Sequence, residues 1–572
     1  MPRRSHRVWT AVAVLVVAVA LPALTAGCAQ RSVYESSEAA EGRESCGGRD
    51  CHEDIVLAKT DGPHAQLGCT GCHEGTGEEH ATDPTVSRAS IEWRIDACSG
   101  CHEQEAATYL YDDNAQPGPF GGSQRVPPQS KQETFPRYNE IVAGHSFAKE
   151  YHEEGAHAFM LEDHYATARG KFDVCVQCKS TKIAWAWNTG AELVVAADTT
   201  VTLTHTRTAD TPASELVVPA GTTLSLATQW DTHRTNTKTT LPDGTVYTSR
   251  PTESEDATAS FNWNWAATIA ATKDTMPYGA GCNHCHDPHT AKPRLIRAAM
   301  LDAIERGGPE GTGGVNPYAS TIINDPDAAS ATDMRILLCA QCHVEYTCGK
   351  SGVDGIVRDA FGWAKAKDLH DLYTNQFAYA QDWRHTLIGE PLIKSQHSET
   401  ELYWESPHYE AGATCSDCHM PVVQTSGGRE FRSHWFTSPY KYHDPELFAA
   451  FASATGLSTG YVDRPCQRCH PDRLERGIAQ QQEVFERQKV VQELLATSAA
   501  RLDEARDAQG IDDTKLHMAV QSHRKAHVLW ENLIVSENSM GFHNFGEVME
   551  SMDAAERHAR EALELTGQAV SR

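Results

Sequence analysis

The sequence predicts a mainly α-helical protein with a small β-rich insertion and long helices near its C-terminus. Beyond residue 472, apolar residues recur at helical spacing among Ala, Glu, Gln and Arg, whereas residues from about 190 to 262 alternate Thr and Val between turn signals. These two patterns are typical of amphipathic helices and of antiparallel strands. Cysteine pairs also recur along a chain with 18 cysteines and 29 histidines, so side chains alone do not explain the core.

The C-terminal helices are expected at residues 472–508, 513–537 and 546–567. Helices of this kind bury one face on a domain or on another subunit. We therefore interpret residues 476–572 as a helical region that contacts a second copy in a homo-oligomer. A further helical pattern covers residues 144–169.

The β-rich insertion is indicated by Val201-Thr202-Leu203-Thr204 and Leu216-Val217-Val218. Turns are expected at Pro219-Ala220-Gly221 and Pro242-Asp243-Gly244 because Pro and Gly favour turn geometry. We expect a small antiparallel sheet.

The N-terminus resembles an export signal. Arg3, Arg4 and Arg7 precede an apolar run from Val8 to Leu24, which is short for a membrane-spanning helix. Small residues before Cys28 are typical of a lipoprotein cleavage site, so residues 1–27 are interpreted as a signal peptide and Cys28 as a candidate for lipidation. The alternative is a plain cleaved signal. Both place the mature chain outside the cytoplasm, in the periplasm or on the outer face of the cytoplasmic membrane, with no contact to the membrane beyond the lipid.

The formal net charge of -27 argues against a nucleic-acid partner, because no basic patch is present to neutralise phosphates. An acidic surface favours solubility, and it also suits docking to a basic redox partner.

The cysteines fall into pairs with a recurring pattern. Cys-x-x-Cys-His attaches c-type haem, since the two thiols bond the haem vinyl groups and the histidine binds the iron. Six copies are present: Cys69/Cys72/His73, Cys98/Cys101/His102, Cys282/Cys285/His286, Cys339/Cys342/His343, Cys415/Cys418/His419 and Cys466/Cys469/His470.

Two further pairs depart from this pattern. Cys46 and Cys51 are separated by four residues before His52, and Cys175-Val176-Gln177-Cys178 is followed by Lys179. Eight pairs use sixteen of the 18 cysteines and leave only Cys28 and Cys348. Zinc knuckles and disulfides are the alternatives, but neither requires a histidine directly after each pair. The pattern therefore predicts eight covalently bound haems and a haem-packed core.

The spacing of these motifs suggests the domain organisation. Three motifs within residues 46–102 leave little chain for a side-chain core, so we assign residues 28–110 to a trihaem domain. Residues 111–475 would form a pentahaem domain, interrupted by the insertion. Seven histidines occupy proximal positions, which leaves 22 of the 29 to complete other irons.

Lys179 in the place of a proximal histidine is chemically distinctive, because an amine binds iron only when deprotonated in a sheltered site. With this motif the sequence resembles the ammonia-forming cytochrome c nitrite reductases, and more closely their octahaem relatives. The resemblance also rests on His157-Ala158-Phe159 followed by Asp163, Thr167 and Arg169, on Glu345-Tyr346 after the sixth motif, and on Lys394-Ser395-Gln396-His397.

The resemblance implies an active site formed by Lys179, Arg169, Tyr346 and His397. It also implies a calcium ion bound by Glu345, Tyr346, Lys394 and Gln396. Tyr346-Thr347-Cys348 resembles the position of a tyrosine–cysteine thioether in octahaem members; an inert buried cysteine is the alternative.

The resemblance further implies four distal haem ligands. His157 would complete the haem at His343, His408 the haem at His470, His434 the haem at His286, and His543 the haem at His419. Distal ligands of the three N-terminal haems are not assigned, with His64, His80, His145 and His152 as unranked candidates.

The implied activity is the six-electron reduction of nitrite to ammonium, fed by seven bis-histidine haems and by an electron-donor protein or quinol dehydrogenase. Two alternatives stay open. One is a related enzyme acting on hydroxylamine, sulfite or tetrathionate, and the other is an electron-transfer cytochrome without a catalytic site. Lysine at the catalytic motif favours reduction over hydroxylamine oxidation, whose enzymes carry an ordinary histidine motif there.

Overall fold

The computed structural model of the chain describes the residues that follow. They are 59, 62–65, 67–68, 72–73, 93–111, 134–145, 157–166, 173–203, 214–229, 234–248, 257–276, 278–297, 300–301, 329–346, 364–376, 383–396, 398–471, 473–533 and 539–570.

The chain forms two compact units. One comprises Met1–Thr60 and His64–Glu92, and the other Asp61–Pro63 and Trp93–Arg572. In the first unit the Leu67 N–H donates to the His64 carbonyl at 3.0 Å. The third cysteine motif belongs to the second unit, where α6 (Glu103–Tyr109) follows it and Glu105 pairs with Arg429 at 2.7 Å.

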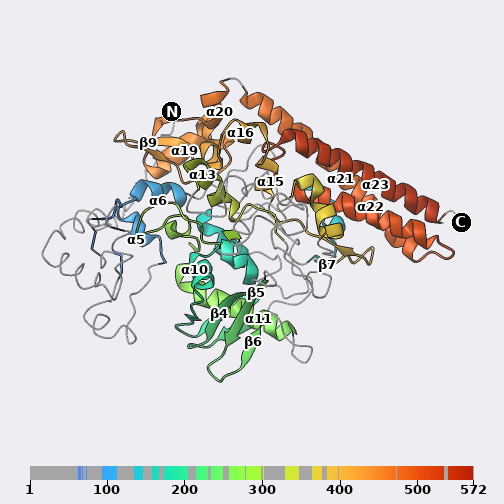
Figure 1. Cartoon of the computed structure of the whole chain (residues 1–572), viewed down its shortest axis with the longest axis horizontal. Helices are drawn as coiled ribbons and strands as arrows, with labels where there is room; N and C mark the ends of the chain where they lie inside the picture. Colours follow the sequence, from blue (N-terminus) through green and yellow to red (C-terminus); the bar gives the residue numbers. More distant parts are fainter. Residues whose placement is uncertain are drawn as a thin grey trace, which may run out of the picture. The chain divides into compact units, whose positions relative to one another are not determined.

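The insertion forms a four-stranded antiparallel sheet and a two-stranded ribbon (Figure 1). The sheet has the order β1-β4-β5-β6, with β1 at Leu193–Val194, β4 at Thr223–Gln229, β5 at Arg234–Thr240 and β6 at Val246–Thr248. The ribbon pairs β2 (Thr199–Leu203) with β3 (Ser214–Val218). Both predicted turns are present, with Gly221 and Gly244 at φ of 81° and 89°. These angles suit glycine because it lacks the Cβ that other residues would have to accommodate.

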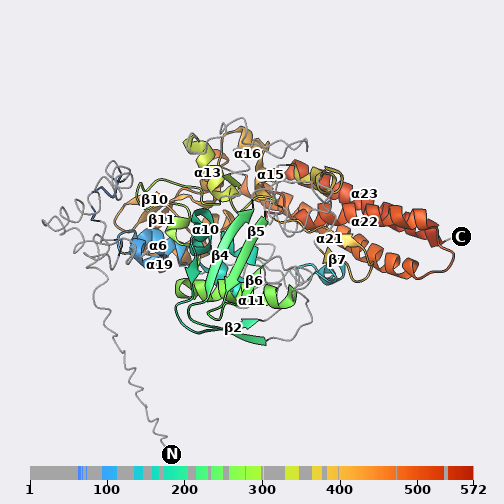
Figure 2. The same ribbon diagram turned by 60° about the horizontal axis from the view of Figure 1, so that its bottom comes forward.

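Helix α11 (Ala257–Thr272) packs against this sheet (Figure 2). Trp265, Ala266, Ala267 and Ile269 on α11 are almost wholly buried and share a hydrophobic cluster with the strands. The insertion expected over about 190–262 thus contains the start of α11, after its last described strand ends at Thr248. The run Ala257–Thr272 is apolar enough to serve as a buried helix, which composition alone does not distinguish from a buried strand.

Helix α10 (Thr181–Thr189) joins the insertion to the lysine motif. Its N-cap is Ser180, whose hydroxyl accepts from the Ile183 N–H at 3.4 Å, and it ends at Gly190 with φ of 66°. Val176 and Ile183, which flank Lys179, belong to the same hydrophobic cluster as the insertion strands. The insertion thus supports the segment that carries Lys179.

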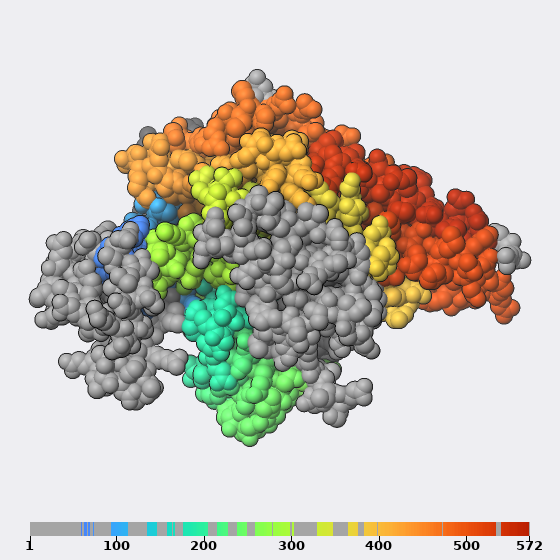
Figure 3. Space-filling model, viewed as in Figure 1, coloured from blue at the N-terminus to red at the C-terminus, as the bar shows by residue number. Residues whose placement is uncertain are grey.

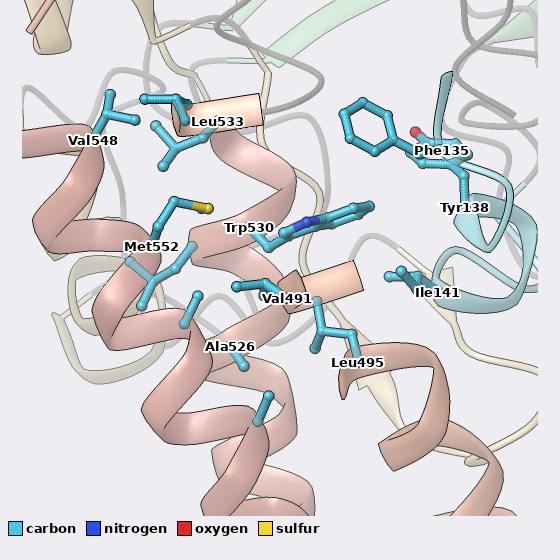
Figure 4. Packing of buried hydrophobic residues seen from close by; sticks show 14 of the residues in the cluster. Phe135, Tyr138, Ile141, Val491, Leu495, Ala526, Trp530, Leu533, Val548 and Met552 are labelled. Atoms are coloured by element: carbon cyan, nitrogen blue, oxygen red, sulfur yellow. The ribbon is translucent and has the colours of Figure 1, made fainter. Parts of the chain in front are cut away.

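Three long helices form the C-terminal bundle (Figure 1): α21 (Leu474–Arg506), α22 (Asp513–Glu531) and α23 (Phe545–Val570). Each lies within a few residues of its predicted range. Val491, Leu495, Ala526, Trp530 and Met552 fill their interface (Figure 4). The helical prediction for this region is confirmed.

Residues 134–145 pack on this bundle. Phe135 and Tyr138 lie against Trp530, with ring centroids 5.8 and 6.3 Å apart (Figure 4). Of the helix expected over 144–169, the described residues include Gly144, whose φ of 89° is not helical, and the helical residues His157–Ala166; α8 (Tyr138–Ile141) lies just before this range.

Shorter elements carry most of the cysteine motifs and their surroundings. The helices are α5 (Asp96–Ser99), η2 (His157–Phe159), α9 (Met160–Ala166), η3 (Asp173–Cys178), η4 (Lys273–Thr275), η5 (Cys282–His284), α13 (Ala331–Ala340), η7 (Ala366–Asp368), α14 (Leu369–Asp371), η8 (Leu372–Gln376), α15 (Glu399–Tyr403), α16 (Pro407–Glu410), α17 (Cys415–His419), α18 (Tyr440–His443), α19 (Pro445–Thr455) and α20 (Pro465–Cys469). The strands are β7 (Trp383–Arg384), β8 (Pro391–Leu392), β9 (Val422–Thr425), β10 (Glu430–Arg432) and β11 (Leu457–Val462).

Within the described part of the chain, no helix has the length and apolar character required to cross a membrane. The insertion (green) and the C-terminal helices (orange to red) both present surface to the viewer in Figure 3.

The packing of the insertion gives a stability prediction. Leu224 on β4 is fully buried, whereas Val217 on β3 is 56% exposed. Leu224→Ala should lower the free energy of unfolding by about 2–5 kcal/mol, because it removes buried methyl groups and leaves a cavity. Val217→Ala should change it by less than about 0.5 kcal/mol. Denaturant titration followed by circular dichroism measures both, and equal effects would contradict this packing.

Candidate functional site

Each described Cys-x-x-Cys-His motif forms a single helical turn. In the motif of α13, the N–H groups of Cys342 and His343 both donate to the Cys339 carbonyl, at 3.1 and 2.9 Å. One turn brings residues three apart onto the same side, which is the arrangement that two bonds to one haem require. In the motifs at η5, α13, α17 and α20, all eight cysteines are free of disulfides and available for thioether bonds.

The third motif has the same turn. The N–H groups of Cys101 and His102 both donate to the Cys98 carbonyl, at 3.1 and 2.9 Å. The role predicted for Cys101 in haem attachment rests on the sequence motif and stays a prediction.

The side chains of the N-terminal motifs also differ in exposure from those of the later motifs. His102 and Cys101 are exposed, whereas the proximal histidines of the motifs at η5, α13, α17 and α20 are half-buried. In the second motif, Cys72 is exposed and not disulfide-bonded, and His73 is half-buried. The roles predicted for Cys72, His73 and His102 rest on the sequence motif and stay predictions.

The four histidine pairs implied by the resemblance lie together in the structure. Their ring centroids are separated by 6.0 Å for His157 and His343, 6.4 Å for His286 and His434, 6.1 Å for His408 and His470, and 6.3 Å for His419 and His543. A metal bound at about 2 Å by one nitrogen of each of two opposed imidazoles holds the ring centres roughly 6 Å apart. The spacing therefore fits four irons, each held between two imidazoles.

Hydrogen bonds orient several of these rings. His419 Nδ1 lies 3.0 Å from the Thr437 carbonyl, His434 Nδ1 lies 2.9 Å from the Arg432 carbonyl, and His343 Nδ1 lies 3.3 Å from Glu399. When Nδ1 donates its proton in this way, Nε2 presents a lone pair for a metal. Three different pairs thus contain a ring whose Nε2 is set for iron.

Burial favours the neutral imidazole that a metal ligand requires. It lowers the pKa of His419 and His434 to about 4. At His343 burial also acts to lower the pKa, but the Glu399 carboxylate outweighs it and raises the pKa.

Several attachment motifs lie beside one another. Cys282 neighbours Cys98, Cys342 neighbours Cys178, and Cys339 neighbours Cys415. Haems attached to such neighbouring cysteines would lie close together, as electron transfer between them requires.

Lys179 follows directly after η3, and its N–H donates to the Val176 carbonyl at 2.9 Å. A Cβ at Gly279 would collide with the Lys179 carbonyl and with Leu161. Only glycine therefore permits this approach, which fixes the lysine backbone.

Two of the other segments that the resemblance assigns to the active site are also in contact. Glu345, fully buried, accepts from the Gln396 N–H at 2.7 Å and from the Tyr373 hydroxyl at 2.6 Å. The neighbours of Tyr346 and His397 are thereby joined. Because Cys342 contacts Cys178, the lysine motif adjoins the motif that precedes Tyr346.

Arg297 is a residue of this site that the sequence interpretation missed. Its guanidinium lies 4.5 Å from the Tyr346 ring centroid, and its Nη1 donates to the Gln341 carbonyl at 2.8 Å. A buried arginine over an aromatic ring is a cation–π contact that fixes the ring. Its sequence signal is weak, since Arg297 is one of several basic residues after the fifth motif.

Several predicted site residues lie outside the described residues. These are Cys28, Cys46, Cys51, His52, Cys69, His80, His152, Arg169, Cys348 and His397, together with the side chain of Cys175. Among the unranked distal candidates, His145 packs against Trp383 with ring centroids 4.2 Å apart, and Trp383 lies against His527 of α22. None of these elements carries a cysteine motif, so a core role suits His145 better.

The pairing of His434 with His286 can be tested separately from catalysis. His434→Ala should convert one six-coordinate low-spin iron to a high-spin iron without loss of covalent haem, because the proximal His286 and both thioether bonds remain. Electron paramagnetic resonance and visible spectra of the oxidised protein report this change. His517→Ala, at an exposed site on α22, is the control; a low-spin spectrum unchanged by His434→Ala would contradict the pairing.

Comparisons with known proteins agree with this arrangement. The sequence profile of the cytochrome c552 family matches residues 102–194 and 244–571, and the residues between, 195–243, fall within the β-rich insertion. The chain is 28% identical over 330 residues to cytochrome c nitrite reductase subunit NrfA of Nitratidesulfovibrio vulgaris (Hildenborough), which covers 54% of this chain and 56% of that protein. It is 32% identical over 216 residues to cytochrome c-552 of Porphyromonas gingivalis, covering 37% of this chain and 35% of the relative.

The chain therefore spans about half or less of the length of these curated relatives. Among solved structures, it is similar to the cytochrome c nitrite reductase catalytic subunit of Desulfovibrio desulfuricans, a structure described with two calcium sites. The TM-score is 0.55 at 21% identity, over 84% of this chain and 87% of that one. This likeness concerns the fold.

Proposed function

Since this chain belongs to the cytochrome c552 family, we propose that it reduces nitrite to ammonium at a haem ligated by Lys179. The observation that carries the proposal is the lysine at the proximal position of one motif, beside four histidine pairs spaced for iron. Imidazole on both faces leaves an iron only electron transfer, whereas a single amine leaves one face open to substrate.

The reaction consumes one nitrite, six electrons and eight protons, and yields one ammonium and two waters. The haem iron supplies the binding position and the electrons for nitrite. Lys179 would ligate that iron, and its segment is fixed by Gly279 and by the α10 cap. Arg169 and His397 would hydrogen-bond the nitrite oxygens, His397 would supply protons as the N–O bonds break, and the Tyr346 phenol would assist later proton transfers.

The residues proposed to bind calcium provide a suitable environment for a hard cation. Glu345 and Glu401 are both fully buried, and Glu401 accepts from the Glu345 N–H at 3.0 Å. Burial and the neighbouring Glu345 raise the pKa of Glu401 well above its usual range. A divalent cation held by the Glu345 carboxylate, the Gln396 side chain and the carbonyls of Tyr346 and Lys394 would offset this negative charge and fix the loop that bears His397.

The wider assembly follows from the same proposal. Eight c-type haems, seven of them with two histidines, would pass electrons to the haem at Lys179 from an electron-donor protein or a quinol dehydrogenase. The protein would work outside the cytoplasm, with Cys28 lipidated after removal of the signal and with copies joined through the C-terminal helices.

Replacement of the axial amine is the direct test. Lys179→His should retain the haem content, because both thioether bonds and a nitrogen ligand remain, while nitrite turnover falls at least about a hundredfold. Ammonium release with reduced viologen as donor measures the rate, and the pyridine haemochrome assay measures haem. Unimpaired turnover would refute the assignment of Lys179. Faster oxidation of hydroxylamine than reduction of nitrite by the unmodified protein would favour the hydroxylamine alternative.

A covalent bond between Tyr346 and Cys348 is a second expectation. It would join the thiol sulfur to a ring carbon with loss of two hydrogens and transfer of two electrons to an oxidant such as O₂. Mass spectrometry of the tryptic peptide should show this loss, which Cys348→Ser should abolish. Alkylation of Cys348 by iodoacetamide in the unfolded native protein would show a free thiol and reject the crosslink.

A further inference from the structure

Helix α22 packs against the described residues that flank His397. Leu392 belongs to a hydrophobic cluster with Ala519 and Val520 of α22. Ile393 packs in another cluster with Val528, more than two turns further along the same helix. The segment thus follows the helix toward its C-terminal end.

At that end, the last residue of α22, Glu531, and the C-cap residue, Asn532, contact residues on the two sides of His397. The Ser395 N–H donates to Glu531 Oε2 at 3.4 Å, and the Ser398 hydroxyl donates to Asn532 Oδ1 at 2.7 Å. Ser395, Ser398 and Glu531 are fully buried, and Asn532 is 1% exposed. Hydrogen bonds at such buried positions are costly to lose, because the abandoned donor or acceptor finds no water.

We propose that Glu531 and Asn532 are positioning residues that hold Ser395 and Ser398, the described residues on either side of His397, and so sustain the catalytic action of that histidine. This inference rests on the proposed role of His397 in nitrite reduction. It assigns a catalytic consequence to the C-terminal end of the bundle helix α22.

The contacts of Glu531 and Asn532 add to the hydrogen bond that Glu345 accepts from Gln396. Glu345 accepts from the Gln396 N–H on one side of the segment, within the proposed calcium site. Asn532 lies outside that site, and its bond to Ser398 joins two neutral side chains. The position of His397 would therefore depend on α22 even where calcium is saturating.

The expected effect is on turnover rather than on haem content. A shift of about 1 Å in a catalytic group can cost roughly a hundredfold in rate. Loss of one of two flanking anchors should allow part of such a shift, so we expect roughly a tenfold loss of kcat with a smaller change in KM.

Ser398→Ala and Ser498→Ala form a matched pair. Both serines are fully buried and both hydrogen-bond a side chain at α22, Asn532 at 2.7 Å and His523 at 3.1 Å. With calcium saturating, Ser398→Ala should lower kcat for nitrite and change its pH profile, whereas Ser498→Ala should leave both near the unmodified values. Spectra and thermal midpoints report any general loss of structure.

If Ser398→Ala does not fold, a second pair of variants, both at Asn532, tests the proposal. Asn532→Asp keeps an oxygen that accepts from Ser398, and Asn532→Leu keeps the size but removes the acceptor. The proposal predicts higher kcat for Asn532→Asp than for Asn532→Leu. Equal kcat in both pairs would overturn it, while an unmodified protein that forms no ammonium would instead refute the proposed function.

Discussion

The separation of about 6 Å between paired histidine rings is the constraint on which the rest of this structure depends. Two imidazoles that share an iron come from different places in the chain. Each must direct one nitrogen at the metal, at a distance set by two metal–nitrogen bonds. His157 and His343 are separated by almost two hundred residues, and His419 and His543 by more than a hundred. The motifs occupy only short helices, so the chain between them can adopt the conformation that brings the paired histidines to this distance.

Ordinary hydrophobic packing holds the surroundings of these pairs. The insertion and α10–α11 share one cluster, and the C-terminal bundle with residues 134–145 shares another. The segment of Lys179 is anchored to the first cluster and the segment of His397 to α22, which belongs to the second. The proposed active site would thus lie between two rigid supports, each approaching it from a different part of the chain.

Much of this arrangement could be predicted because its signals are local. Cysteine spacing identifies the attachment motifs, helical periodicity identifies α21, α22 and α23, and the resemblance to a known family implies the histidine pairs. Arg297 over Tyr346 and Asn532 beside Ser398 could not be predicted in this way. Both contacts join positions far apart in sequence.

The sequence also did not separate the start of α11 from the β-rich insertion. Ala257–Thr272 is buried along most of its length, with polar Asn264 and Thr268 buried beside Trp265, so its sequence lacks the polar face whose periodicity separates helix from strand. The insertion itself could be recognised as β-rich from Thr and Val, although residues 195–243 have no counterpart in the family's profile. Its support for the Lys179 segment emerged only from the tertiary contacts.

The central claim is that one iron is bound by an amine on one face and is open on the other. Magnetic circular dichroism of the fully oxidised protein, with electron paramagnetic resonance for spin counting, tests it most directly. We predict one high-spin haem among seven low-spin bis-imidazole haems, with the high-spin signal converted by added cyanide. Eight low-spin haems, all with two imidazoles and none altered by cyanide, would contradict the account.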